Sequence, residues 1–203
     1  MDELNVIRTT KKKREVLPIT QYFGEMDLNE KQTEERVMFA IRMRDLILVV
    51  FALVELGNTQ KAIQTLSDGY REIAEQYHDT DFDFNKYINL FSREIVRNTS
   101  KHIDDEYYTS TDRAILIAEN EANTTLNNVD LLRAKESGKT HKKWLTMQDM
   151  NVRPTHHEVD EQVIPIDEYF KVGVSLMRFP KDYQGINVTG EETVNCRCTI
   201  QYL

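Results

Sequence analysis

Two cysteines that are separated by a single residue are the most reactive groups in this 203-residue sequence. Cys196 and Cys198 lie in the terminal run Thr193-Val-Asn-Cys-Arg-Cys-Thr-Ile-Gln-Tyr-Leu203, where apolar and polar residues alternate. The alternation predicts a β-strand that carries both thiols on its buried face. Two steps along a strand separate the Cα atoms by about 6.6 Å, near the upper limit for a disulfide, and parallel side chains are poorly aimed for one.

Two thiols on one face can instead share a metal ion. Zinc takes about four Cys or His ligands, and we assign His156 to a candidate zinc site with Cys196 and Cys198, with His141 and His157 also nearby in the sequence. The spacing is not that of a zinc finger, so other interpretations stay open. Buried free cysteines also serve as small apolar core residues, and a thiol beside a histidine base can do redox or nucleophilic chemistry.

No other catalytic pattern is present. The sequence has no Ser/His/Asp constellation, Walker A loop, GxGxxG or HExxH motif. Asp79, Asp81 and Asp83 alternate as in a calcium loop, but the glycine and the final glutamate of such a loop do not follow. We therefore assign no catalytic residue and regard the chain as more consistent with a non-enzyme.

The elements that must position these groups fall into two classes. Apolar residues recur at spacings of three and four over four segments, which predicts helices at about 33–56, 59–77, 84–101 and 111–136. Glycines and prolines concentrate after residue 137, where Gln162–Ile166 and Val172–Phe179 are strand candidates. The predicted fold class is α+β, with about four helices followed by a small mixed module of short strands.

Charge is distributed as unevenly along the chain as the glycines and prolines. The net charge is −8, of which residues 1–137 carry −7 and residues 138–203 carry −1. An acidic helical part argues against broad DNA binding, which requires Lys and Arg at the phosphates, and the one dense basic run is Lys11–Arg14. The longest apolar run, Leu46–Val54, is too short for a membrane span of about 20 residues. No export signal is visible, so we expect a cytoplasmic protein with reduced thiols.

These observations suggest three regions. We expect a partly flexible N-terminal arm over residues 1–32, a helical domain over 33–110 and a C-terminal module over 111–203. Two cysteines are too few for a disulfide scaffold of this length.

The C-terminal module resembles a known family, the phage head-morphogenesis or Mu protein F-like minor capsid proteins. The resemblance covers about residues 112–203 and rests on motifs of the form W-x-T-x-x-D, V-R-x-x-H, D-x-Q, P-x-D and E-x-x-N-C-R-C. The residues that carry it are Trp144, Asp149, Arg153, His156, Asp160, Gln162, Pro180, Asp182, Asn195, Cys196, Arg197 and Cys198. Glu161 stands where the family usually has glycine, so a turn there is reshaped.

The resemblance implies a structural phage protein. Such proteins are minor head components that join the portal vertex during assembly, remain in the virion and in some cases enter the host with the DNA. It implies partners among the portal and other head proteins, host cytoplasm during assembly, no membrane, and weak or no direct DNA binding. Arg153, His156, Asn195 and Arg197 would hold the module together, and Trp144 would anchor its core.

Two alternatives to a structural phage protein stay open. Relatives of this module are often fused to toxin or nuclease domains, so an enzyme that uses His156, Arg153 and the cysteines is one. A zinc-stabilised adaptor with no phage role is the other.

Overall fold

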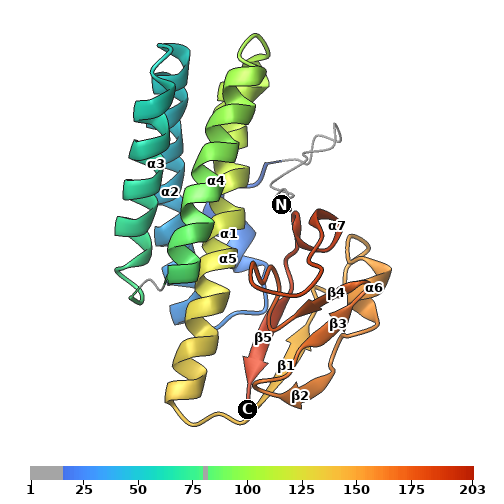
Figure 1. The fold of residues 1–203 in the computed structure, drawn as a ribbon. Coiled ribbons are helices and arrows are strands. Elements are labelled where there is room, and N and C mark those ends of the chain that lie inside the picture. The colour runs from blue at the N-terminus through green and yellow to red at the C-terminus, as the bar shows by residue number, and fades with distance from the viewer. Residues whose placement is uncertain (1–15, 80–81) are drawn as a thin grey trace. The chain divides into compact units, whose positions relative to one another are not determined.

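Long helices form where the apolar spacing predicts them. The computed structural model describes residues 16–79 and 82–203, so the basic run Lys11–Arg14 and Asp81 lie outside the described residues. The helices in chain order are α1 (Ile19–Gly24), α2 (Glu30–Glu55), α3 (Thr59–Ala74), α4 (Phe82–Lys101) and α5 (Thr111–Glu136), with the 3-10 helix η1 (Glu106–Thr109) before α5 (Figure 1). The four predicted helices correspond to α2–α5, whereas α1 was not predicted.

Glycines end two of these helices by the same mechanism. Gly57 after α2 and Gly138 after α5 have φ angles of +73° and +77°. Behind each glycine, the next backbone N–H reaches back to the last turn, from Asn58 to Leu53 O at 2.9 Å and from Lys139 to Ala134 O at 3.0 Å. This Schellman arrangement satisfies carbonyls that the helix leaves without partners, and it requires the left-handed conformation that glycine adopts readily.

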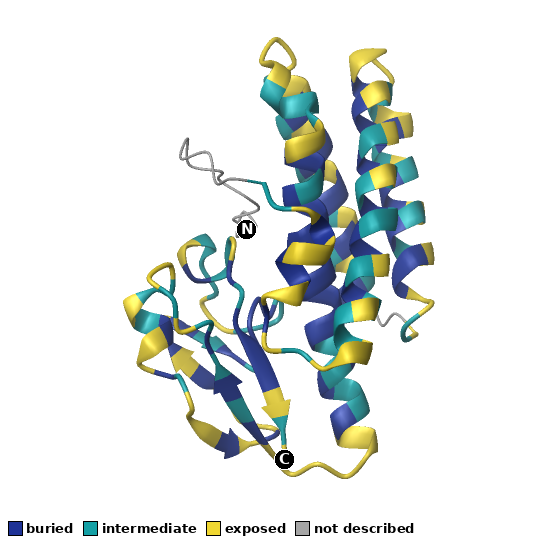
Figure 2. Cartoon of the chain, turned by 180° about the vertical axis from the view of Figure 1, so that it is seen from behind, coloured by how far each residue is buried: buried dark blue, intermediate teal, exposed yellow. Residues whose placement is uncertain are grey.

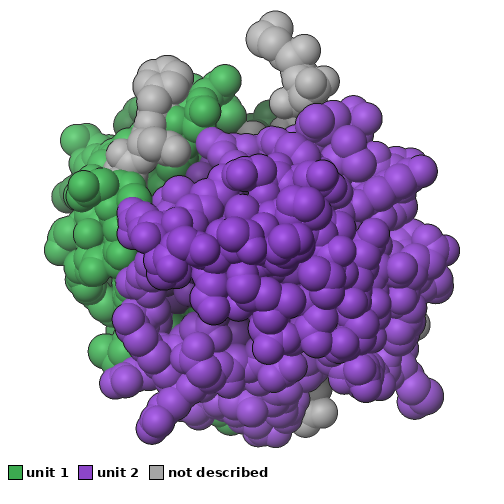
Figure 3. All heavy atoms as spheres, turned by 90° about the horizontal axis from the view of Figure 1, so that it is seen from below, with its two compact units in different colours: residues 1–19, 36–122 green, residues 20–35, 123–203 purple. Residues whose placement is uncertain are grey.

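The described chain divides into two compact units, which Figure 3 colours separately. The first contains residues 36–122 and is helical, with residues 16–19 assigned to it. The second contains residues 20–35 and 123–203. Helices α2 and α5 each contribute residues to both units.

Tyr70 of α3 lies at the centre of the helical unit. Its ring contacts Phe39, Phe84 and Phe91 in edge-on arrangements, with centroids 5.5–6.0 Å apart. Its hydroxyl donates to Glu121 Oε2 at 2.8 Å. Helices α2, α3 and α4 bury one face and expose the other, as Figure 2 shows by colour, whereas α5 is buried on all sides over residues 116–127. None of the described helices has the length and apolar character that a membrane span requires.

The second unit is built on two small antiparallel sheets. Strands β1 (His141–Leu145), β2 (Val163–Pro165) and β5 (Thr199–Tyr202) form the first, in the order β2-β1-β5. Strands β3 (Phe170–Val172) and β4 (Ser175–Met177) form a hairpin. The short helices α6 (Pro154–His157) and α7 (Gly190–Thr193) lie in the connections. The predicted α+β class is confirmed.

The predicted strands need two corrections. The segment Val172–Phe179 is a hairpin rather than one strand, because the chain reverses at Gly173, where φ is +58°. The terminal strand begins only at Thr199, because Thr193 ends α7 and Asn195 takes a φ of +55°. An extended strand does not accommodate that conformation, which asparagine tolerates better than most residues.

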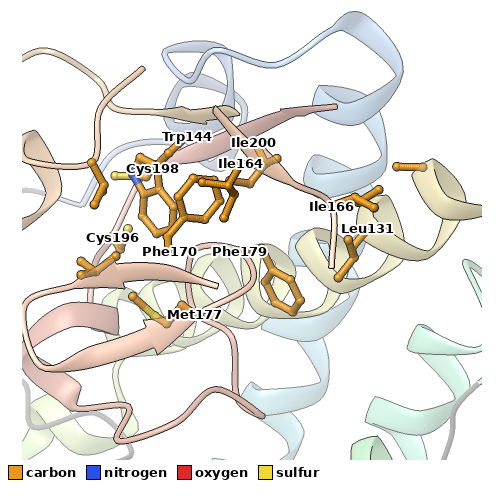
Figure 4. Close-up of a cluster of buried hydrophobic side chains, with 13 residues drawn as sticks. Leu131, Trp144, Ile164, Ile166, Phe170, Met177, Phe179, Cys196, Cys198 and Ile200 are labelled. Atoms are coloured by element: carbon orange, nitrogen blue, oxygen red, sulfur yellow. The ribbon is translucent and has the colours of Figure 1, made fainter. Parts of the chain in front are cut away.

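Segments from both ends of the chain complete the second unit. Asn123 and Asp130 of α5 bond Tyr22 Oη and Gln32 Nε2 at 3.3 and 3.0 Å. The core joins residues of α5 to both sheets (Figure 4), namely Leu131, Ala134, Trp144, Val159, Ile164, Ile166, Phe170, Val172, Met177, Phe179, Cys196, Cys198 and Ile200. Trp144 is fully buried, so the prediction that it anchors the core is confirmed.

Candidate functional site

The histidine and the two cysteines converge in the core of the second unit. His156 lies on α6, whose first position is Pro154, a residue that favours helix initiation. Its Nδ1 atom lies 3.2 Å from Cys198 Sγ and 3.6 Å from Cys196 Sγ. All three donor atoms lie within 4.8 Å of one another. Only 1% of His156, 2% of Cys196 and 4% of Cys198 is exposed.

A carboxylate holds the other side of the imidazole ring. His156 Nε2 lies 3.1 Å from Glu192 Oε2, which also accepts a 2.8 Å hydrogen bond from Thr155 Oγ1. Because a carboxylate accepts, Nε2 carries the proton and a neutral ring has its lone pair on Nδ1, toward the sulfurs. His156 therefore joins α6 to Glu192 of α7 through Nε2 and to Cys198 through Nδ1.

The three groups shift one another's ionisation. The Cys198 thiol, followed by the His156 ring, holds the pKa of the Cys196 thiol well below its ordinary value, although burial opposes this. The hydrogen bond to Cys196 and burial raise the pKa of Cys198. Burial lowers the pKa of His156, but Cys196 reverses the direction and the net shift is upward.

The remaining motif residues secure the segments around this cluster. Arg153 donates to the backbone carbonyl of Val194, which joins the start of α6 to the chain after α7. Arg197 pairs with Asp149 and lies 3.8 Å from Glu25 Oε2. Asn195 forms the left-handed turn before Cys196. These contacts agree with a positioning role for all three.

The P-x-D motif forms a separate buried ion pair. Asp182 is fully buried, and its two oxygens accept from Arg178 Nε and NH2, both at 2.7 Å. Pro180 O accepts a 2.9 Å hydrogen bond from Asn127 of α5. This turn is therefore attached to the helix that leads into the module.

The other two candidate histidines do not join the cluster. His157 is adjacent to His156 but exposed, and His141 is exposed on β1, where its Nδ1 bonds Thr140 Oγ1 at 2.9 Å. A helix places successive side chains about 100° apart, so only one of two adjacent histidines can face the core. Among the described residues, the group of metal-donor side chains is His156, Cys196 and Cys198.

Sequence reasoning missed Glu192 and Lys142. Glu192 is the first residue of the E-x-x-N-C-R-C pattern, and that position could have identified it. Lys142 carried no such signal: it is fully buried, and its Nζ lies 5.5 Å from the centre of the Phe170 ring without a hydrogen-bond partner among the described residues. Burial lowers the pKa of Lys142 from 10.5 to about 8.

Two kinds of chemistry fit the cluster. A thiolate beside an imidazole whose far nitrogen is held by a carboxylate resembles the arrangement of nucleophilic cysteine sites. Two cysteines and a histidine with the same carboxylate also match the ligands and the outer partner of a zinc centre. Burial favours the second, because a substrate must reach the sulfur whereas a single ion can be enclosed.

Comparisons with known proteins give one family and one relative. The family described as "Phage Mu protein F like protein" matches residues 59–201. A curated relative, NAD(+)--arginine ADP-ribosyltransferase EFV of Enterococcus faecalis (strain ATCC 700802 / V583), is 32% identical over 119 residues. That match covers 57% of this chain and 24% of the relative. No solved structure matches the chain.

The family match extends further than the sequence motifs indicated. It begins at residue 59 rather than 112, and so includes α3 and α4 of the helical unit as well as nearly all of the C-terminal module. The chain belongs to the phage Mu protein F-like family.

Proposed function

We propose that this protein is a structural minor component of a phage head that associates with the portal vertex during assembly. The observation that carries the proposal is the family match over residues 59–201. It supports a head-morphogenesis role in general, and the contact with the portal is the finer step that we add. The virion and, during assembly, the host cytoplasm are the proposed locations.

The use of the motif residues supports a structural role. Arg153 and Arg197 bond within the unit to Val194 O and Asp149. Asp182 is engaged by Arg178. Buried or partly buried side chains that form hydrogen bonds within the unit stabilise the fold. A catalytic group, in contrast, must contact a substrate.

The charge distribution supports a protein partner. Residues 1–137 carry a net charge of −7, which repels the DNA phosphates and leaves exposed carboxylates for basic surfaces of other proteins. We therefore propose portal and other head proteins as the partners, with weak or no direct binding to DNA.

Co-assembly with the head proteins of the same phage tests the proposal. The chain would be tagged and co-expressed with the portal protein, and with portal, scaffold and major capsid proteins together. We expect it to co-purify with the portal and to be present in purified procapsids by mass spectrometry. Absence from portal complexes, procapsids and virions alike would contradict the proposal.

The relative supports a second candidate, an enzyme that acts on NAD⁺. The match covers only 24% of that transferase, so its activity can reside in the part that this chain does not match. Incubation with labelled NAD⁺ and an arginine-containing acceptor tests this candidate, and we expect no transfer. If label is transferred and the double variant His156→Ala, Cys196→Ala retains the activity, these two residues are not the catalysts.

A further inference from the structure

We infer that His156, Cys196 and Cys198 bind one zinc ion through Nδ1 and the two Sγ atoms. The three donors come from α6 and from the segment between α7 and β5, about 40 residues apart in the chain. A bound ion would cross-link these two segments. The inference does not depend on the proposed role in the phage head.

The distances from the histidine to the two sulfurs are close to those of a zinc site. Zn–S bonds of about 2.3 Å and Zn–N bonds of about 2.0–2.1 Å at tetrahedral angles place N and S about 3.6 Å apart. The corresponding distances from His156 Nδ1 are 3.2 Å to Cys198 and 3.6 Å to Cys196. Shifts of a few tenths of an ångström would therefore place the donors around such an ion.

The outer partners also have the form that a metal site requires. Histidine ligands of metals usually donate the other ring N–H to a carboxylate or carbonyl, which fixes the tautomer and orients the ring. Glu192 accepts from His156 Nε2 and is itself held by Thr155. The Nδ1 lone pair is left for the position between the two sulfurs.

Trp144 provides an independent indication. Its buried indole nitrogen has no oxygen or nitrogen acceptor among the described residues, and Figure 4 shows it beside the Cys198 sulfur, the one group with which it interacts as a hydrogen-bond donor. A buried donor without an acceptor is costly. A thiolate is a better acceptor than a thiol, and metal binding requires thiolates, so zinc would make Cys198 a stronger acceptor for this N–H.

Charge balance favours an ion at this depth. Isolated thiolates are expensive to bury, but two thiolates and one Zn²⁺ sum to zero. Three protein donors leave one tetrahedral position, which a water molecule can fill. The ligand set is softer than those of Mg²⁺ or Ca²⁺, which prefer oxygen.

Metal content of the purified protein tests the inference. The full chain would be loaded with excess ZnCl₂ under reducing conditions, dialysed and measured by elemental mass spectrometry. We expect about one zinc per chain for the wild type. We expect little zinc for Cys196→Ser and for His156→Ala, whereas the matched control His157→Ala, with its exposed neighbouring side chain, keeps the full content.

A second pair of variants tests the outer partner. Glu192→Gln should reduce zinc affinity by about 10- to 100-fold, measured by competition with a chelator. Glu191→Gln replaces the exposed neighbour and should leave the affinity unchanged. Equal affinities for the two variants would contradict the role assigned to Glu192.

Cobalt keeps the test decisive if a variant fails to fold. Wild-type protein loaded with Co²⁺ should show thiolate-to-cobalt charge-transfer absorption and the intense visible bands of tetrahedral coordination. A wild type that is folded by circular dichroism, retains no zinc after loading and gives no such spectrum would overturn the inference.

Discussion

Glu192 determines which nitrogen of His156 faces the cysteines. A carboxylate at Nε2 leaves Nδ1 as the acceptor, so one hydrogen bond of 3.1 Å sets the chemistry of the buried cluster. The hairpin turn packs against the same carboxylate, since a Cβ added at Gly173 would collide with Glu192 Oε1. The position of Glu192 therefore depends on several neighbours as well as on its own helix.

Replacement of Lys142 should stabilise the protein. The substitution Lys142→Met keeps the apolar stem and removes an ammonium group that has no hydrogen-bond partner among the described residues. Burial lowers the pKa of Lys142 from 10.5 to about 8, which corresponds to a cost of about 3 kcal/mol for the charged form. Urea unfolding at pH 7 should show a gain of about 2–4 kcal/mol.

The pH dependence gives a second signature of the same lysine. Because the native pKa lies below the unfolded value, the unfolded state binds more protons between about pH 8 and pH 10.5. The contribution of Lys142 to the free energy of unfolding of the wild type therefore rises with pH across that window. The variant Lys142→Met should not show this rise. Lys143→Met, which removes a partly exposed ion pair with Glu161, is the control and should change stability by about 1 kcal/mol or less.

At the scale of elements, the short helices depend on contacts from loops. Helices α6 and α7 have four residues each, far fewer than the roughly 12–15 that an isolated helix needs in water. Arg153 bonds Val194 O, and Arg197 bonds Asp149. These contacts join the segments on either side of α6 and α7.

Removal of the Asp149 charge tests one of these contacts. Burial raises the pKa of Asp149, but the Asn151 N–H and Arg197 outweigh it and the net shift is downward. Because the native pKa of Asp149 is lowered, its ionised carboxylate stabilises the protein at pH values above the ordinary pKa of 3.8. This stabilisation is lost as the pH falls through the native pKa. Asp149→Asn should therefore destabilise at pH 7 by less than about 1 kcal/mol, because the pair is partly solvated.

Urea unfolding at a series of pH values measures this effect. The difference in the free energy of unfolding between Asp149→Asn and the wild type should shrink as the pH approaches 3. Glu158→Gln replaces an exposed carboxylate nearby and should show no such dependence. A loss for Asp149→Asn that persists unchanged at low pH would indicate that the charge is not the cause.

The C-terminal end of α5 offers a test of backbone conformation. Gly138 has a φ of +77° and open space around it, so Gly138→Ala should cost about 1–2 kcal/mol through conformation alone. Gly24→Ala also meets no neighbouring atom but needs no positive φ, and should be neutral or stabilising. Thermal melts of both variants measure the contrast, and equal effects would show that the left-handed conformation is not responsible.

At the scale of the whole molecule, charge and family membership point to protein assembly. The net charge is −8, and nearly all of it belongs to the part before residue 138. We therefore expect no binding to duplex DNA tighter than about 10⁻⁴ M at physiological salt, the weak end of non-specific binding. Fluorescence anisotropy with a labelled duplex measures this, and micromolar affinity would contradict the expectation of weak or no direct DNA binding.

The sequence by itself determined the four long helices and the family. Helix periodicity is a local property, so the stripes of α3 and α4 and the glycine stops after α2 and α5 could be read from neighbouring residues. The motif spacing around Trp144 and Cys196 indicated the family, which the match over residues 59–201 confirms. The short strands were read less well, because a few residues carry little periodic signal.

Only the tertiary structure decided how the chemistry is assembled. The contacts of His156 with Cys198 and Glu192 join residues 42 and 36 positions apart, and no local pattern encodes such a distance. The same is true of Lys142, whose burial follows from strands on both sides of β1 and from the Phe170 ring. Of the three candidate histidines, His156 is the one that long-range packing places beside the two thiols in the core. The side chains of His157 and His141 are exposed.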